Sequence, residues 1–289
     1  MTFAALLTRR MEATGSVACV GLDPVLEQLP AEVRARHHDP LAAIAEFCHG
    51  ALRAVAGHVA AVKFQSACFE RYGGRGVVVL EECIREAVRH GLVVVLDVKR
   101  GDIGLTAGHY AEAARRTGAH SVTLSGYMGP STIRPFLDTG LGVFVLVRTS
   151  NPDSDVVQSQ RLADGRTVAE AMADVVAELA REDMKKFGGE VSSVGAVVGA
   201  TKASDAAALR VRMPGSVFLV PGYGAQGGTA DDIRAMVRKG AGGAEGVGAG
   251  VLVTASRSVI YARAVDGSWE KGVERAAETL TEELRGVVG

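Results

Sequence analysis

Two side chains of opposite charge, Asp97 and Lys99, interrupt an apolar segment of the chain. The segment is predicted to be extended, and residues two positions apart on a strand point to the same side of it. We therefore expect the carboxylate and the ammonium group to lie close together. Each charge then stabilises the other, so that Asp97 stays ionised and Lys99 stays protonated. This is the state required for proton donation beside a negative charge.

Asp23 and Lys63 stand at the ends of two further apolar segments, and we expect them to reach the same rim as Asp97 and Lys99. An array of alternating carboxylates and ammonium groups compensates its own charges, whereas any one member buried alone would be costly. The alternative is a buried ion-pair cluster that only fixes the geometry of the fold. We favour a chemical role because a purely stabilising cluster has no reason to gather at the ends of strands.

A second group of residues has the composition of an anion site. The segment 221–228 reads PGYGAQGG, and its glycines allow backbone N–H groups to approach phosphate oxygens. Arg257 follows another apolar segment and opens a predicted helix, where its guanidinium group and the helix N-terminus both favour an anion. The alternative is an ordinary glycine-rich turn beside a surface arginine. We expect a phosphate site at these two segments.

Apolar, β-branched runs alternate with amphipathic segments along the whole chain, and almost continuously apolar runs are typical of strands in a parallel sheet covered on both faces. The predicted strands are Val17–Leu22, Val59–Phe64, Leu92–Val98, Ala119–Leu124, Val143–Val147, Val194–Val198, Val217–Val220 and Val247–Val253. The predicted helices are Pro40–Ala56, Val77–His90, Thr106–Thr117, Thr132–Leu137, Thr167–Phe187, Ala203–Val211, Ala230–Arg238 and Trp269–Arg285. This order predicts an α/β fold, a closed (β/α)8 TIM barrel with its active site at the carboxyl ends of the strands. A doubly wound open sheet is the competing architecture, but no GxGxxG motif follows the first strand.

Composition narrows the function classes further. We expect residues 1–289 to form one barrel domain with short N-terminal and C-terminal helical extensions. A net charge of −1 gives no basic field for nucleic acid, and no apolar run is long enough to span a membrane. The first residues lack a signal-peptide pattern, so we expect a cytoplasmic protein. The four cysteines have no disulfide or zinc-ligand spacing and are predicted core residues, and we expect no metal.

The motifs together resemble one enzyme family. The segment 96–107, LDVKRGDIGLTA, is similar to the DxKxxDI signature of orotidine 5′-phosphate decarboxylases, and the chain resembles their long bacterial subgroup, type 2. The resemblance runs in order from about residue 15 to residue 262, through GLDP at 21–24, KFQSACFE at 63–70, RTSNP at 148–152, VVGAT at 197–201, PGYGAQGG at 221–228 and SRS at 256–258. One departure is Ser125-Gly126, which stands where the subgroup typically has Asn-Pro.

The resemblance implies decarboxylation of orotidine 5′-phosphate to UMP and CO₂, the last step of de novo UMP biosynthesis, without a cofactor. It implies that Lys63, Asp97 and Lys99 form the charged array and that Lys99 stabilises and then protonates a carbanion at C6. It also implies a homodimer in which Asp102 and Thr106 of one subunit complete the site of the other. The substrate-binding residues that it implies are Asp23, Thr106, Ser150, Gln226, Gly227 and Arg257.

Three other functions fit parts of the pattern. A magnesium-dependent sugar-phosphate decarboxylase or synthase of the same barrel superfamily would use the carboxylates as metal ligands. A class I aldolase would use Lys63 or Lys99 as a Schiff base, although flanking carboxylates favour the protonated amine. A non-catalytic nucleotide-binding barrel is the third alternative, and the complete set of Asp97, Lys99 and Asp102 argues against it.

Overall fold

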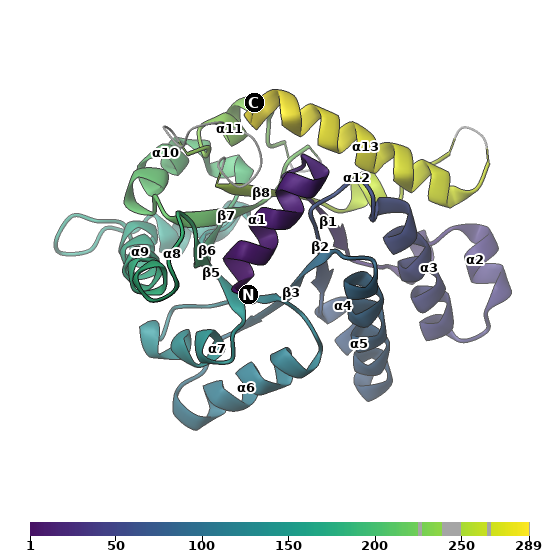
Figure 1. Ribbon diagram of the computed structural model, residues 1–289, viewed down its shortest axis with the longest axis horizontal. Helices are drawn as coiled ribbons and strands as arrows, with labels where there is room; N and C mark the ends of the chain where they lie inside the picture. The colour runs from purple at the N-terminus through teal and green to yellow at the C-terminus, as the bar shows by residue number, and fades with distance from the viewer. Residues whose placement is uncertain (225–226, 239–249, 265–266, 289) are drawn as a thin grey trace.

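Eight parallel strands close into a barrel in the computed structural model, which describes residues 1–224, 227–238, 250–264 and 267–288 (Figure 1). Each strand pairs with the next, and the last pairs with the first. The strands are β1 (Ala18–Leu22), β2 (Ala61–Gln65), β3 (Val93–Arg100), β4 (Ser121–Leu124), β5 (Gly142–Arg148), β6 (Ser192–Val198), β7 (Ser216–Pro221) and β8 (Val251–Ala255). The predicted TIM barrel is confirmed, and the open-sheet alternative is wrong.

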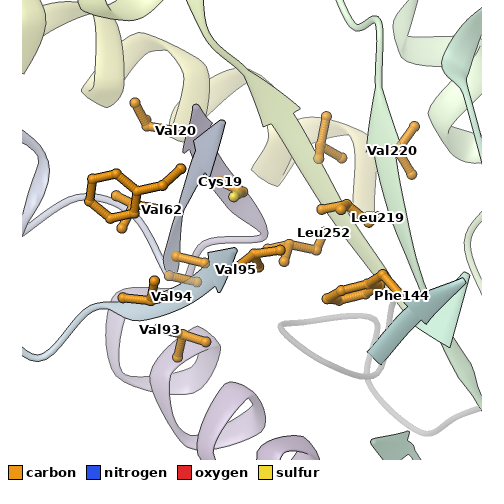
Figure 2. Close-up of a cluster of buried hydrophobic side chains, with 14 of the residues drawn as sticks. Cys19, Val20, Val62, Val93, Val94, Val95, Phe144, Leu219, Val220 and Leu252 are labelled. Atoms are coloured by element: carbon orange, nitrogen blue, oxygen red, sulfur yellow. The ribbon is translucent and has the colours of Figure 1, made fainter. Parts of the chain in front are cut away.

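The barrel is filled by one side of each strand. Buried side chains of neighbouring strands, among them Cys19, Val95, Phe144, Leu219 and Leu252, form the cluster shown in Figure 2. Every second side chain of a strand faces the barrel axis, so the residue two positions further along lies in the next layer, and on β3 and β8 that residue is polar. On β3, for example, Asp97 follows Val95, and on β8 Thr254 follows Leu252. The apolar layer therefore supports a polar layer at the carboxyl ends of the strands.

Helices surround the strands. The α-helices are α1 (Phe3–Thr14), α2 (Ala31–Arg36), α3 (Pro40–Val55), α4 (Ala67–Glu70), α5 (Gly73–Arg89), α6 (Gly104–Arg116), α7 (Arg134–Asp138), α8 (Asp155–Gln158), α9 (Val168–Phe187), α10 (Ala203–Arg212), α11 (Ala230–Arg234), α12 (Arg257–Ile260) and α13 (Trp269–Val288). Short 3₁₀ turns lie at η1 (Leu26–Gln28), η2 (Pro130–Thr132), η3 (Pro152–Ser154) and η4 (Ala200–Lys202). None of the helices in the described part of the chain has the length and apolar character needed to cross a membrane.

The first helix closes the amino-terminal end of the barrel. The backbone N–H of Ala4 donates a hydrogen bond of 3.2 Å to Oγ of Ser193 at the start of β6. The ring of Phe3 meets that of Phe144 edge to face, with 5.8 Å between the centroids. A side chain at Gly142 would overlap the Phe3 ring, so only glycine allows this close approach. The cavity of the barrel lies at the opposite, carboxyl-terminal end of the strands.

Most predicted elements are present with shifted ends. The predicted strand at 247–253 falls partly on residues 247–249, which lie outside the described residues. Helix α11 ends at Arg234, four residues before the predicted Arg238, and the predicted helix at 132–137 is a 3₁₀ turn followed by α7. Three of the cysteines are buried, Cys68 is half-buried, and all four are free thiols.

Candidate active site

The charged side chains that the sequence singles out form a continuous row at the carboxyl end of the barrel. Lys63 Nζ on β2 lies 3.3 Å from Oδ1 of Asp23, the residue after β1, and 3.1 Å from Oδ2 of Asp97 on β3. Lys99 Nζ donates a 2.6 Å hydrogen bond to Oδ1 of Asp97. The side chains of Lys63 and Asp97 are 8% and 9% exposed, whereas that of Lys99 is 47% exposed. The row thus has a buried centre and an accessible amine at one end.

The charges of this row keep its buried members ionised. Burial alone would lower the pKa of Lys63, but the negative charges of Asp23 and Asp97 raise it above its ordinary value. Burial would raise the pKa of Asp97, but the charges of Lys63 and Lys99, with hydrogen bonds from Lys99 and Thr123, hold it below its usual range. The two buried members, Lys63 and Asp97, therefore both carry their charge around neutral pH.

The strand that carries Asp97 and Lys99 is not regularly extended, contrary to the expectation from their spacing. Leu96 pairs with Val122 and Arg100 with Leu124, so four steps along β3 match two steps along β4. Lys99 has φ of 44°, and it is the one non-glycine residue with positive φ among those that the structure describes. The two side chains still meet, because the irregular backbone turns the Lys99 side chain towards Asp97.

A cavity of about 560 Å³ opens above this row. Every strand of the barrel, or the loop that follows it, contributes to the wall. The residues that line it are Asp23, Lys63, Gln65, Asp97, Lys99, Thr123, Leu146, Thr149, Ser150, Asn151, Gln158, Val197, Leu219, Pro221, Gly222, Tyr223, Thr254, Ala255, Ser256 and Arg257. Its volume is in the range of sites that hold small organic ligands. Lys99 points into this space from one side of the barrel, while Arg257 lines it at the end of β8.

The chain matches known proteins along nearly its full length. The family model described as "Orotidine 5′-phosphate decarboxylase / HUMPS family" matches residues 17–271. The chain belongs to this family. A relative named orotidine 5′-phosphate decarboxylase from Rhodopirellula baltica is 40% identical over 311 aligned positions, which cover 99% of this chain and all of the relative. A relative of the same name from Deinococcus radiodurans is 38% identical and covers the whole chain and 98% of its own length.

A solved structure agrees with this assignment. The structure of Leishmania donovani OMP decarboxylase superposes with a TM-score of 0.79 and 35% sequence identity, covering 99% of this chain and 98% of that one. The resemblance inferred from the motifs is therefore confirmed, both for the family and for the barrel architecture.

The residues at which the sequence analysis expects a phosphate site follow β7 and β8. Gly222, Tyr223 and Arg257 line the cavity, and Arg257 is the first residue of α12, as predicted. Gly227 has φ of 90°, and its backbone N–H donates to the carbonyl oxygen of Gly224 over 2.9 Å. Gln226 lies outside the described residues. Gly227 does not line the cavity and its N–H is paired within the turn, so Arg257 is the one residue predicted to bind phosphate that the described part of the chain brings to the cavity wall.

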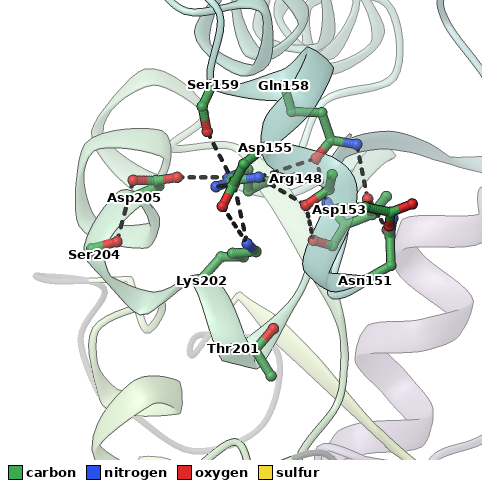
Figure 3. A network of polar contacts seen from close by, with 12 residues as sticks. Arg148, Asn151, Asp153, Asp155, Gln158, Ser159, Thr201, Lys202, Ser204 and Asp205 are labelled. Carbon is green, nitrogen blue, oxygen red and sulfur yellow. Dashed lines mark hydrogen bonds and ion pairs between the residues drawn. The ribbon is translucent and has the colours of Figure 1, made fainter.

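Ser150 lies on a loop that a network of charged side chains holds in place (Figure 3). Arg148, at the end of β5, is buried and pairs with Asp155 of α8 and, at 2.6 Å, with Asp205 of α10. Lys202 Nζ reaches both oxygens of Asp155 at 3.1 Å. The loop after β5 is thus tied to α8 and α10.

Two residues that the family resemblance assigns to the site lie away from their own cavity. Asp102 accepts a 2.8 Å hydrogen bond from the backbone N–H of Ile103, and Thr106 is exposed on the first turn of α6. Neither of them lines the cavity of the chain to which it belongs.

At Ser125-Gly126, where the chain departs from the subgroup pattern, the backbone lies close to β3 and to α9. The backbone N–H of Ser125 donates a 2.8 Å hydrogen bond to the carbonyl oxygen of Arg100, which joins the ends of β4 and β3. A Cβ atom at Gly126 would lie 2.7 Å from Sδ of Met172. The methionine side chain of α9 therefore occupies the space that a larger residue at position 126 would need.

The sequence analysis assigned no individual role to several polar residues that line the cavity. Gln65 and Thr123 lie on β2 and β4, while Thr149, Asn151 and Gln158 belong to the loop region after β5. Alternation along the strands would have placed Gln65 beside Lys63, because the two are separated by one residue. A single threonine in a strand carries no such signal, since β-branched residues are common there.

Proposed function

We propose that this chain is an orotidine 5′-phosphate decarboxylase, which converts orotidine 5′-phosphate to UMP and CO₂ in the last step of de novo UMP synthesis. The observation that carries this proposal is the accessible Lys99 amine, held 2.6 Å from the buried Asp97 carboxylate at the wall of the cavity. Family membership and full-length relatives of this name support the same activity.

The chemistry explains why such a row is needed. Breaking the bond from C6 to the carboxylate leaves the electron pair in an sp² orbital of C6, with no adjacent π system to accept it. A fixed cation beside that carbon stabilises the developing negative charge without reorganising at the moment of reaction. Lys99 then gives a proton to C6 and completes UMP. Catalysis of this kind requires lowering the barrier by roughly 20 kcal/mol.

We assign the remaining contacts from the position of each group in the cavity. Asp97 would lie against the substrate carboxylate, and its repulsion would be relieved as CO₂ leaves. Asp23 would hold a ribose hydroxyl and Ser150 the pyrimidine. Arg257 would bind the phosphate, with Gln226 and the backbone near Gly227. Binding energy from the phosphate then helps to hold the reacting carbon next to Lys99.

We further propose a homodimer in which Asp102 and Thr106 reach the cavity of the second copy. Both residues lie outside the cavity of their own chain, next to apolar side chains exposed to solvent. These exposed side chains are Ile103, Leu105, Tyr127 and Met128, at the ends of β3 and β4. An isologous interface at this rim would bury the apolar side chains and bring Asp102 to the partner's row of charges.

The donor set does not favour a metal. Asp97 uses one carboxylate oxygen towards Lys63 and the other towards Lys99 and Thr123, and Asp23 faces Lys63. A magnesium site needs carboxylate oxygens that cations do not already occupy. A cofactor-free mechanism therefore fits these residues better than the magnesium-dependent alternative does. The free thiols of all four cysteines fit the cytoplasm as the compartment that we propose.

The test is the loss of absorbance of orotidine 5′-phosphate with purified protein in the presence of EDTA. We expect turnover that the chelator leaves unchanged. Lys99→Ala should lower turnover by more than about 1000-fold and still bind UMP, because the amine acts on the reacting carbon. Lys186→Ala is the control, since Lys186 lies on α9 away from the cavity.

Each alternative has its own outcome in the same assay. Activity that disappears with EDTA indicates the magnesium-dependent enzyme. Trapping of a covalent adduct with borohydride and substrate indicates a Schiff-base lysine. Tight UMP binding without turnover of a folded wild-type protein indicates a binding protein and contradicts the proposal.

A further inference from the structure

We propose that Thr123 is a positioning residue that fixes the relative placement of Asp97 and Lys99. This inference rests on the proposed function, because it assigns a role within the same reaction. Thr123 lies on β4, its side chain lines the cavity, and 1% of the residue is exposed.

The hydroxyl of Thr123 connects the side chain of one charged residue to the backbone of the other. Its Oγ1 donates a 2.8 Å hydrogen bond to Oδ1 of Asp97. The same oxygen accepts hydrogen bonds from the backbone N–H groups of Val98 and Lys99, at 3.1 Å and 3.0 Å. A hydroxyl has one proton and two lone pairs, so these contacts use its full hydrogen-bonding capacity.

The contacts fall at the irregular part of β3. Between Leu96 and Arg100 the strand lacks regular pairing with β4, so the N–H groups of Val98 and Lys99 need another acceptor. Thr123 supplies this acceptor from the neighbouring strand β4. The left-handed conformation of Lys99 is one that a residue with a side chain rarely adopts and that the surroundings must enforce. We infer that Thr123 enforces it and thereby directs the amine of Lys99 to Asp97.

A different result is expected if Thr123 only fills space. In that case valine, which has nearly the same volume, would replace threonine without effect on turnover. If the hydroxyl positions the pair, valine should disturb the chemical step, since small displacements of reacting groups are costly. Serine, which keeps the hydroxyl and loses only a methyl group, should restore it.

The experiment compares three variants. We expect Thr123→Val to lower kcat by roughly 100-fold, with KM and the Kd for UMP changed much less. Thr123→Ser should stay within a few-fold of wild type. The matched control is Ser121→Ala, which removes a hydroxyl from the same strand two residues earlier. Ser121 is buried, and its Oγ has no hydrogen-bond partner among the residues that the structure describes.

The dependence of kcat on pH distinguishes the loss of the Thr123 hydrogen bond from a loss of packing, because packing alone would not shift this dependence. Asp97 faces Lys63 of β2, Lys99 of β3 and Thr123 of β4, with Asp23 beyond Lys63. Removing the Thr123 hydrogen bond should raise the pKa of Asp97 and move the acid limb of kcat to higher pH. The ionisation of the substrate is common to all variants and cancels in the comparison.

Two results would overturn the inference: full turnover by Thr123→Val, or a loss that Thr123→Ser does not restore. If the wild-type protein is inert, the proposed function fails, and the inference is then tested by a crystal structure of Thr123→Val. We expect Lys99 to leave its left-handed conformation or to lose its contact with Asp97. An unchanged Lys99 in that structure would contradict the positioning role whatever the activity.

Discussion

Asp97 is the residue on which the row of charges depends, because its two carboxylate oxygens join Lys63 to Lys99. The same contacts that prepare it for catalysis also couple its ionisation to folding. The pKa of Asp97 is lower in the folded protein than in an unfolded chain. In an unfolded chain an aspartate carboxyl has a pKa of about 3.9. Ionised Asp97 therefore stabilises the fold above that pH, and the contribution is lost as the pH falls through the folded-state pKa.

Replacing Asp97 should make this coupling measurable. Between about pH 6 and about pH 3, we expect wild type to lose more of its free energy of unfolding than Asp97→Asn, which has no carboxyl to protonate. Urea denaturation at the two pH values measures the difference. Asp138→Asn, at an exposed aspartate that ends α7, is the control and should follow wild type. Equal acid sensitivity of wild type and Asp97→Asn would show that Asp97 is not stabilised in its ionised form.

At the scale of elements, Arg148 joins the end of β5 to α8 and α10 and so holds the loop that carries Ser150. Its guanidinium group also donates to Oγ of Ser154 at 3.0 Å, so one buried side chain serves three segments. Lysine could not make these contacts together, because its single ammonium group lacks the fork of donors.

Removing this connection should affect both stability and substrate binding. We expect Arg148→Met to lower the free energy of unfolding by about 2 kcal/mol, less than for a fully buried pair, because the half-exposed Asp155 and Asp205 regain water. The loosened loop should raise KM more than it lowers kcat. Arg134→Met, which breaks an exposed pair with Glu182, should cost less than about 0.5 kcal/mol. Unfolding and steady-state kinetics that match wild type would contradict this account.

The strands could be predicted from the sequence, but the detailed contacts within the site could not. All eight predicted strands overlap strands of the barrel, because long apolar, β-branched runs carry a strong signal. Helices of four to six residues such as α2, α4 and α8 were missed, since a single turn shows no periodicity. The irregular course of β3, the contacts of Thr123 and the pair of Arg148 with Asp205 depend on residues far apart in the chain. No local pattern reveals them.

For the whole molecule, the two ends of the barrel differ: one is covered by a helix, and the other carries the cavity. Helix α1 seals one end, and the layer of apolar side chains fills the interior below the charged row. The open end carries the cavity together with the exposed Ile103, Leu105, Tyr127 and Met128. Since Asp102 lies among these residues and outside its own cavity, the dimer proposed above would join two incomplete sites into two complete ones.

Mixing two inactive variants tests this exchange of residues. In a hybrid of Lys99→Ala with Asp102→Ala, one site would combine an intact Lys99 with an intact Asp102 from the other subunit, and the second site would lack both. Random reassociation of equal amounts should therefore recover about a quarter of wild-type activity. The measurement is turnover after joint unfolding and refolding, with each variant refolded alone as the control. If both residues served the same chain, the hybrid would have no intact site and the mixture would remain as inactive as its components.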